Sequence, residues 1–155
     1  RRRHTIFKRP MVANVDQVIL VFSVVRPDLN PLLIDRFLIL AEMSDLAAIL
    51  CLSKIDLVGP ADFTTISKLY QNIGYPVFPV SARSGEGITA IKSILAGKIT
   101  ALAGPSGAGK SSLLNAVEPG FKLVTSEISE KIGRGRHTTR QAELLALSQG
   151  GFMRG

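Results

Sequence analysis

Cysteine is close to absent, since Cys51 is the single cysteine among 155 residues. A lone cysteine excludes an internal disulfide and indicates a reducing compartment. Because Cys51 lies within an apolar run, we interpret it as a small buried hydrophobic side chain and not as a reactive thiol. The chain also has only two histidines. No cluster of cysteine and histidine has the spacing of a metal site, so we predict that the chain binds no zinc.

Long hydrophobic runs are lacking as well. No apolar stretch reaches the roughly 18 residues needed to cross a bilayer, and the longest, near 18–25 and 47–52, suit buried strands. The basic start Arg1–Arg3 is not followed by an apolar segment of signal-peptide length. We therefore expect no membrane partner, and a location in the cytoplasm or, in a eukaryote, in the stroma or matrix of an organelle.

Acidic residues are missing from the first nine positions, which hold the basic residues Arg1, Arg2, Arg3, Lys8 and Arg9. Removing these five positive charges takes the formal net charge from +7 to +2. A second basic cluster consists of Lys131, Arg134, Arg136 and Arg140. The two clusters fit an anionic polymer partner such as RNA, and they fit a solubilising tail and a solvated loop equally well.

The rest of the composition is that of one globular domain, with 46% hydrophobic and 20% charged residues. Apolar runs that predict strands alternate with segments that predict helices. Strands are expected at 16–23, 47–52, 76–80, 98–103 and 142–147, and helices at 32–43, 61–73, 87–95 and from about 110. The polar, basic and glycine-rich stretch 121–139 predicts a long loop.

Two of the predicted helices carry an apolar stripe. The stripe of 32–43 consists of Leu33, Phe37 and Leu40, and that of 61–73 of Ile66, Leu69, Tyr70 and Ile73. Strands that alternate with helices indicate right-handed crossovers and a mainly parallel sheet covered on both faces, which is a three-layer α/β/α architecture. Ligands of such sheets bind at the carboxyl ends of the strands, and the three motifs below all follow predicted strands.

The most specific motif is a phosphate loop that fits Gly-x-x-x-x-Gly-Lys-Ser/Thr between a predicted strand and a predicted helix. Its backbone N–H groups and the positive end of the helix would stabilise phosphates. Lys110 is expected to reach the β- and γ-phosphates, and Ser111 to ligate Mg²⁺. The predicted nucleotide-binding residues are Gly104, Pro105, Ser106, Gly107, Ala108, Gly109, Lys110, Ser111 and Ser112. A nucleotide kinase or a transport ATPase would also accommodate this motif.

A second motif, Ser53-Lys54-Ile55-Asp56, resembles the Asn/Thr-Lys-x-Asp element by which GTPases recognise guanine. The Asp56 carboxylate can accept from both N1–H and the exocyclic amine of guanine, whereas adenine presents no such pair of donors. The stem of Lys54 can cover a face of the base. Ser53 stands where most of these proteins have asparagine, and we expect it to lose part of the usual hydrogen bonding.

A third motif, Ser81-Ala82-Arg83, resembles the Ser-Ala-Lys/Leu element of GTPases, in which a backbone N–H near the alanine is offered to guanine O6. Both base-reading elements precede the phosphate loop, which reverses the usual order. This order resembles the circularly permuted GTPases, and permutation is permitted because the termini of a domain often lie close together. The expected fold class is therefore a P-loop NTPase of α/β class, a three-layer α/β/α structure with a mainly parallel sheet and circularly permuted GTPase topology.

Further stretches, at 9–18, 34–38 and 135–145, are similar to the ribosome small subunit-dependent GTPases of bacteria and organelles. This resemblance covers nearly all of residues 9–151. It implies a GTPase that uses GTP, GDP and Mg²⁺ and assists late assembly of the small ribosomal subunit, with that subunit and its rRNA as partners. It also implies that Thr138 or Thr139 closes on Mg²⁺ and the γ-phosphate, and that His137 helps to position the attacking water. Together with Lys110, these are the predicted catalytic residues.

The family pattern includes an Asp-x-Pro-Gly element that does not occur between residue 147 and Gly155. We expect residues 1–9 to be a basic tail or linker remnant, and residues 10–155 to be a monomeric GTPase domain that is incomplete at its C-terminus. Hydrolysis by this chain should be slow or lost, because phosphoryl transfer depends on complete positioning. Two alternatives stay open, namely a guanylate-kinase-like phosphotransferase and a catalytically inactive module that binds nucleotide or RNA.

Overall fold

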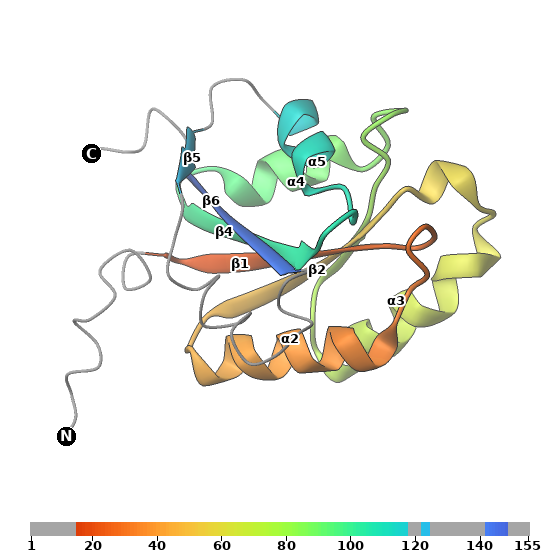
Figure 1. Cartoon of the computed structure of the whole chain (residues 1–155), viewed down its shortest axis with the longest axis horizontal. Coiled ribbons are helices and arrows are strands. Elements are labelled where there is room, and N and C mark those ends of the chain that lie inside the picture. Colours follow the sequence, from red (N-terminus) through yellow and green to blue (C-terminus); the bar gives the residue numbers. More distant parts are fainter. Residues whose placement is uncertain (1–14, 118–121, 125–141, 149–155) are drawn as a thin grey trace.

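A mainly parallel sheet forms the centre of the molecule (Figure 1). The computed structural model describes residues 15–117 and the two strands at 122–124 and 142–148. Its four parallel strands lie in the order β3 (Val77–Pro79), β2 (Ala47–Ser53), β1 (Gln17–Ser23) and β4 (Ile99–Pro105). All of β1 is buried, since strands flank both its edges and helices cover both its faces. This burial explains the unbroken apolar run 18–22.

Two antiparallel strands extend the sheet beyond β4. Strand β6 (Ala142–Ser148) pairs with β4 along seven positions, and β5 (Lys122–Val124) pairs with β6. The expected strand at 142–147 is thus confirmed, whereas the expectation of a loop throughout 121–139 is wrong at 122–124. A segment of three residues is too short to show a period of two, and its strand conformation depends on pairing with a segment distant in sequence.

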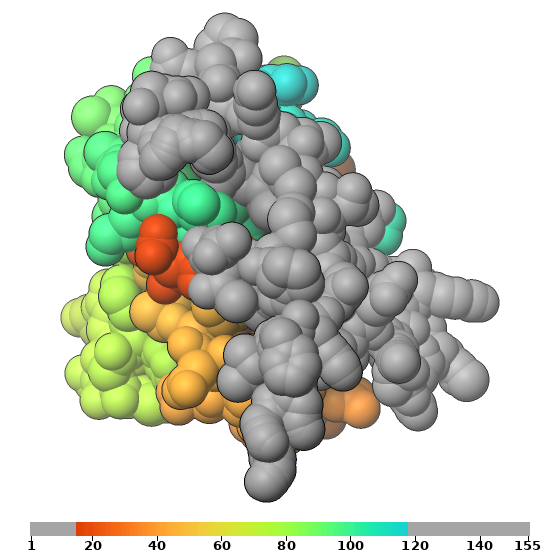
Figure 2. All heavy atoms as spheres, turned by 90° about the vertical axis from the view of Figure 1, so that its left-hand side faces the viewer, coloured from red at the N-terminus to blue at the C-terminus, as the bar shows by residue number. Residues whose placement is uncertain are grey.

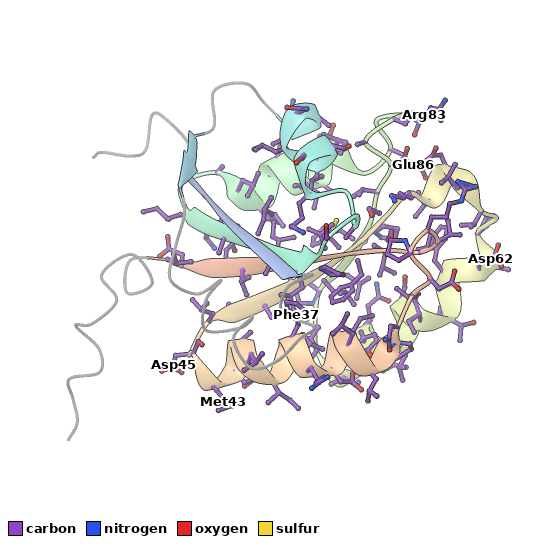
Figure 3. The ribbon with its side chains drawn as sticks, in the orientation of Figure 1. Phe37, Met43, Asp45, Asp62, Arg83 and Glu86 are labelled. Atoms are coloured by element: carbon purple, nitrogen blue, oxygen red, sulfur yellow. The ribbon has the colours of Figure 1, made fainter. Side chains whose placement is uncertain are left out.

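Helices α2 (Pro31–Met43) and α3 (Ala61–Ile73) cover one face of the sheet. Asn30 caps α2, because its Oδ1 accepts hydrogen bonds from the backbone N–H groups of Leu32 and Leu33, and proline occupies the first helical position. From α2 the ring of Phe37 points into the core, whereas Met43 points away from the sheet (Figure 3). Phe37 meets Phe22 of β1 edge to face, with ring centroids 5.5 Å apart.

The predicted apolar stripes of these two helices are only partly right. The residues of α2 that are buried are Ile34, Phe37, Leu38 and Ala41, whereas Leu33 and Leu40 are half-buried. In α3, Tyr70 is buried as predicted and Ile66 is half-buried, but Leu69 and Ile73 are exposed. The Tyr70 hydroxyl donates to Asp35 Oδ1 on α2 at 2.7 Å. The polar end of Tyr70 therefore points toward α2, which fixes the face that α3 buries.

Helices α4 (Ile88–Leu95) and α5 (Lys110–Val117) cover the other face, which completes the expected three-layer arrangement. Their core positions include Ile91, Leu95 and Leu113, packed against Leu102 of the sheet. Cys51 is fully buried in this layer, and burial raises the pKa of its thiol to about 12. The thiol is therefore neutral, as its apolar sequence context predicted. Among the described residues, no helix has both the length and the hydropathy that crossing a bilayer requires.

The central layer should be sensitive to loss of volume. Replacing Leu102, which is 1% exposed, with alanine is expected to lower the free energy of unfolding by about 2–5 kcal/mol, because the substitution leaves a cavity between β4 and the helices. Urea denaturation would measure the change. The matched control is Leu32→Ala on α2, where the side chain is 69% exposed and the loss should stay below about 1 kcal/mol. Equal losses at the two positions would contradict the packing described here.

Candidate functional site

The carboxyl ends of the four parallel strands meet at one edge of the sheet, on the right in Figure 1. Each strand passes there into a loop that contains one of the predicted motifs or lies beside one. Figure 2 looks at the opposite end of the molecule, where the start of β1 (red) lies beside residues near the start of β4 (green). At that end Asp16 N donates to Ile99 O at 2.8 Å, and Ile99 N donates to Asp16 Oδ2 at 2.9 Å. All three motifs therefore lie at one end of the sheet.

The loop between β4 and α5 has the shape that a phosphate loop requires. A Cβ atom at Gly104 would collide with the backbone carbonyl oxygen of Val21, so only glycine lets β4 approach β1 this closely. Gly107 and Gly109 have φ angles of 87° and 98°, in the left-handed region that favours glycine. The curvature of the loop, and the orientation of its backbone N–H groups, thus depend on the glycines of the motif.

Lys110 begins α5 and is only 3% exposed. Its Nζ donates to the carbonyl oxygens of Gly104, at 2.8 Å, and Pro105, at 2.9 Å. The ammonium group thus lies against the predicted phosphate loop. Together with the amino end of α5, it gives the loop a positive potential suited to an anion.

Ser53, at the end of β2, is 5% exposed, and its Oγ donates to the carbonyl oxygen of Ala108 at 2.5 Å. The two residues are 55 positions apart in sequence. A Cβ atom at Gly109 would lie 3.4 Å from Ser53 Oγ, so the short serine fits against a glycine of the loop. The sequence predicted a nucleotide contact for Ser53. The structure adds a bond to the phosphate loop that sequence reasoning did not anticipate.

Lys54 connects three loops. Its backbone has a φ of 63°, and its Nζ donates to the carbonyl oxygens of Arg26, at 2.5 Å, and Gly107, at 2.9 Å. The stem of Lys54 crosses between the predicted base-reading loop and the phosphate loop. Sequence reasoning missed the turn that contains Arg26, because its only local signal was the pair of prolines at 27 and 31.

Asp56 lies in the short 3₁₀ helix η2 (Ile55–Leu57) and is oriented by Ser81. The fully buried Ser81 donates from Oγ to Asp56 Oδ1 at 2.9 Å and accepts from the N–H of Ser84 at 3.0 Å. This hydrogen bond connects the second and third motifs, which are 25 residues apart. Asp56 itself is exposed, so its carboxylate remains accessible to a ligand.

A cleft of about 190 Å³ lies between the predicted base-reading loops and the predicted phosphate loop. Its lining residues are Ser53, Lys54, Asp56, Leu57, Val80, Ala82, Arg83, Gly109, Ser112 and Leu113. Leu57, Val80, Arg83 and Leu113 were not among the predicted site residues. Figure 3 shows Arg83 and Glu86 on the loop that follows β3, at this end of the molecule. The cleft thus combines a carboxylate at one end with the beginning of α5 at the other.

Several predicted residues lie outside the described ranges. They are His137, Thr138 and Thr139, the basic cluster Lys131, Arg134, Arg136 and Arg140, and the basic positions of residues 1–9. Among the predicted ligands of Mg²⁺, Ser111 is described. It is exposed in the first turn of α5, directly after the buried Lys110. The Ser111 hydroxyl is an oxygen ligand of the kind that Mg²⁺ uses when it binds together with a polyphosphate.

A family model and several curated proteins of one name are similar to the chain. A family model described as RsgA GTPase matches residues 1–154. The chain is 48% identical over 151 residues to the small ribosomal subunit biogenesis GTPase RsgA of Moorella thermoacetica, with 97% of this chain and 52% of that protein covered. It is 47% identical over 154 residues to the protein of that name from Thermotoga maritima, with the same coverage.

Two solved structures are similar to the described fold. The crystal structure of YjeQ from Thermotoga maritima gives a TM-score of 0.64 at 40% identity, with 74% of this chain and 45% of that chain covered. The crystal structure of YloQ, a circularly permuted GTPase, gives 0.62 at 41% identity, with 72% and 41% covered. The expected α/β fold with permuted topology is therefore confirmed. The chain spans about half the length of the curated relatives it matches.

Proposed function

The chain belongs to the RsgA GTPase family, and from this premise we propose that it binds guanine nucleotides and hydrolyses GTP to GDP and phosphate during assembly of the small ribosomal subunit. The names of its relatives support this function. The comparisons give no support to the alternatives, a guanylate-kinase-like phosphotransferase or an inactive nucleotide- or RNA-binding module. The observation that carries the proposal is that one cleft is lined by Asp56 together with Gly109 and Ser112.

Guanine would bind at the Asp56 end of this cleft. The hydrogen bond from Ser81 holds one carboxylate oxygen in place, which orients the other toward the N1–H and amino donors of the base. The stem of Lys54 would cover one face of the ring, since its ammonium is already bound to two backbone carbonyls. The backbone N–H near Ala82 would serve guanine O6.

The phosphates would bind on the loop 104–112. Lys110 would exchange its bonds to Gly104 and Pro105 for charge-assisted bonds to the β- and γ-phosphates. Ser111 would hold Mg²⁺, which neutralises phosphate charge when it is bound. Thr138 or Thr139 would add a further ligand, and His137 would position the attacking water. The loop would therefore contribute electrostatic stabilisation of the transition state.

The proposal also covers partners and location. The basic segments at 1–9 and 131–140 would contact rRNA of the small subunit through phosphate charge. The domain 10–155 would work as a monomer without zinc. Its setting would be the cytoplasm, or the stroma or matrix of an organelle.

Titration with nucleotides tests the proposal directly. We expect GDP and GTP to bind about a hundredfold more tightly than ATP, because adenine would leave the Asp56 carboxylate without its two donors. Addition of small ribosomal subunits should raise GTP turnover. Phosphoryl transfer from ATP to GMP would favour the kinase alternative. Equal affinity for ATP and GTP would exclude the guanine-binding role of Asp56.

The bond between Ser53 and the phosphate loop gives a second test of this site. Ser53→Ala removes the donor to Ala108 O. We expect GDP affinity to fall about tenfold, because a buried hydrogen bond contributes about 1 kcal/mol and because the phosphate loop loses a bond that holds it in place. Isothermal titration would measure the change. The matched control is Ser93→Ala on the exposed face of α4, whose hydroxyl bonds only to Thr89 O of the same helix. A loss of GDP affinity in Ser93→Ala as large as that in Ser53→Ala would contradict a role for the Ser53–Ala108 hydrogen bond in nucleotide binding.

A further inference from the structure

The turn between β1 and α2 lies against the tip of the phosphate loop. Lys54 Nζ donates to both Arg26 O and Gly107 O, so these two carbonyls lie side by side. A Cβ atom placed on Gly107 would lie 3.6 Å from Cδ of Pro27. Neither Arg26 nor Gly107 lines the cleft assigned to the base. The turn therefore borders the site on the phosphate side.

The backbone of Arg26 is held firmly in this position. Its φ of 49° lies in the left-handed region, which a non-glycine residue adopts at an energetic cost. Three hydrogen bonds hold the turn, namely Val24 N to Ser53 O at 3.0 Å, Ser23 Oγ to Pro27 O at 3.1 Å, and Lys54 Nζ to Arg26 O. A strained backbone conformation that three hydrogen bonds maintain indicates that the position of Arg26 serves the site.

Arg26 is exposed, and among the described residues no hydrogen bond or ion pair occupies its guanidinium group. The Arg26 side chain consists of consecutive bonds of about 1.5 Å each, so it is long enough to extend past the neighbouring Gly107. The guanidinium fork binds phosphate oxygens through two parallel N–H groups, which an ammonium cannot do. A polyphosphate on the loop would bring several negative charges within its range.

We propose that Arg26 contacts the β-phosphate of the bound nucleotide, as a second cation beside Lys110. This inference deepens the proposed function and depends on it only in requiring a nucleotide whose phosphates occupy the loop 104–112. Lys110 lies on that loop from the start of α5, whereas Arg26 would reach it from the turn after β1. The site would then hold the terminal phosphates between two positive side chains from distant parts of the sequence.

Substitution of Arg26 tests the contact. Arg26→Asn removes the charge and keeps a residue type that adopts left-handed φ readily, so the turn should persist. We expect affinity for GTP and GDP to fall about tenfold, as is typical for loss of a charge-assisted bond, while affinity for GMP, measured by competition, changes less than twofold. Arg26→Lys should restore part of the loss. Arg36→Asn, at an exposed position on α2, is the matched control and should leave all three affinities unchanged.

The outcomes separate this inference from the proposed function. If the wild-type chain binds ATP as tightly as GTP, and Arg26→Asn weakens both, the phosphate contact stands and the guanine assignment fails. An equal loss for GMP, GDP and GTP would overturn the contact, because it would show that Arg26 acts on the shape of the turn. Unchanged affinity for all three nucleotides would overturn it as well.

Discussion

Replacing Lys110 with methionine is expected to lower GTP and GDP affinity by at least about a hundredfold, since charge-assisted hydrogen bonds contribute about 1.5–3 kcal/mol each and 1.4 kcal/mol corresponds to a factor of ten. The ammonium is buried and lies against the loop 104–109. Methionine fills a similar volume without the charge. Fluorescence titration with labelled GDP would measure the affinity, and single-turnover hydrolysis should fall at least as far, because the positive charge also stabilises the transition state.

The control for this experiment is Lys98→Met, at an exposed position just before β4 and far from the loop. Its nucleotide affinity should match that of the wild type. The melting temperature of Lys110→Met should be recorded as well, because the carbonyls of Gly104 and Pro105 lose a donor. A folded Lys110→Met variant with wild-type GTP affinity would refute the placement of the phosphates on this loop.

Replacing Asp56 with asparagine is expected to reverse the preference between guanine and xanthine nucleotides. Asparagine presents one donor and one acceptor, which matches the carbonyl and N1–H of xanthine but opposes the amino group of guanine. We expect GDP affinity to fall about a hundredfold, as when a site built for a hydrogen bond meets an unmatched partner, and xanthosine diphosphate to bind more tightly than GDP. The bond from Ser81 to Oδ1 can persist in the variant, so the loop should keep its shape.

Asp45→Asn is the matched control for Asp56→Asn. Asp45 is exposed, lies at the opposite end of the molecule in Figure 3 and has a φ of 63°, which asparagine tolerates. The preference of the Asp45→Asn variant for guanine over xanthine nucleotides should equal that of the wild type. If Asp56→Asn keeps the wild-type preference for guanine, the base-reading loop has been placed wrongly.

Much of this architecture could be predicted from local patterns in the sequence. The run 18–22 is apolar because both faces of β1 are covered. The phosphate loop could be recognised in the sequence because its glycines adopt backbone angles that other residues rarely adopt. The order of the motifs indicated permutation, since order along the chain is independent of position in space. Each of these features depends on residues that are close together in sequence.

Features that arise from long-range pairing were less predictable. The strand at 122–124 depends on β6, and the stripe of α3 was right for Tyr70 but wrong for Leu69 and Ile73, which are exposed. The bond from Ser53 to Ala108 O and the turn at Arg26 were missed for a similar reason. A side chain that binds a distant backbone carbonyl leaves no periodic signal, because the acceptor is present in every residue.

The bonds from Ser53 and Lys54 to the phosphate loop have a consequence for binding energetics. The proposed base-reading loop and the proposed phosphate loop are directly connected, since Ala108 O and Gly107 O accept from Ser53 and Lys54. The free energies of the two halves of a nucleotide should therefore not add independently. A ligand fragment that orders one half would make it easier for the other half to bind, so the intact nucleotide should bind more tightly than the sum of its fragments suggests.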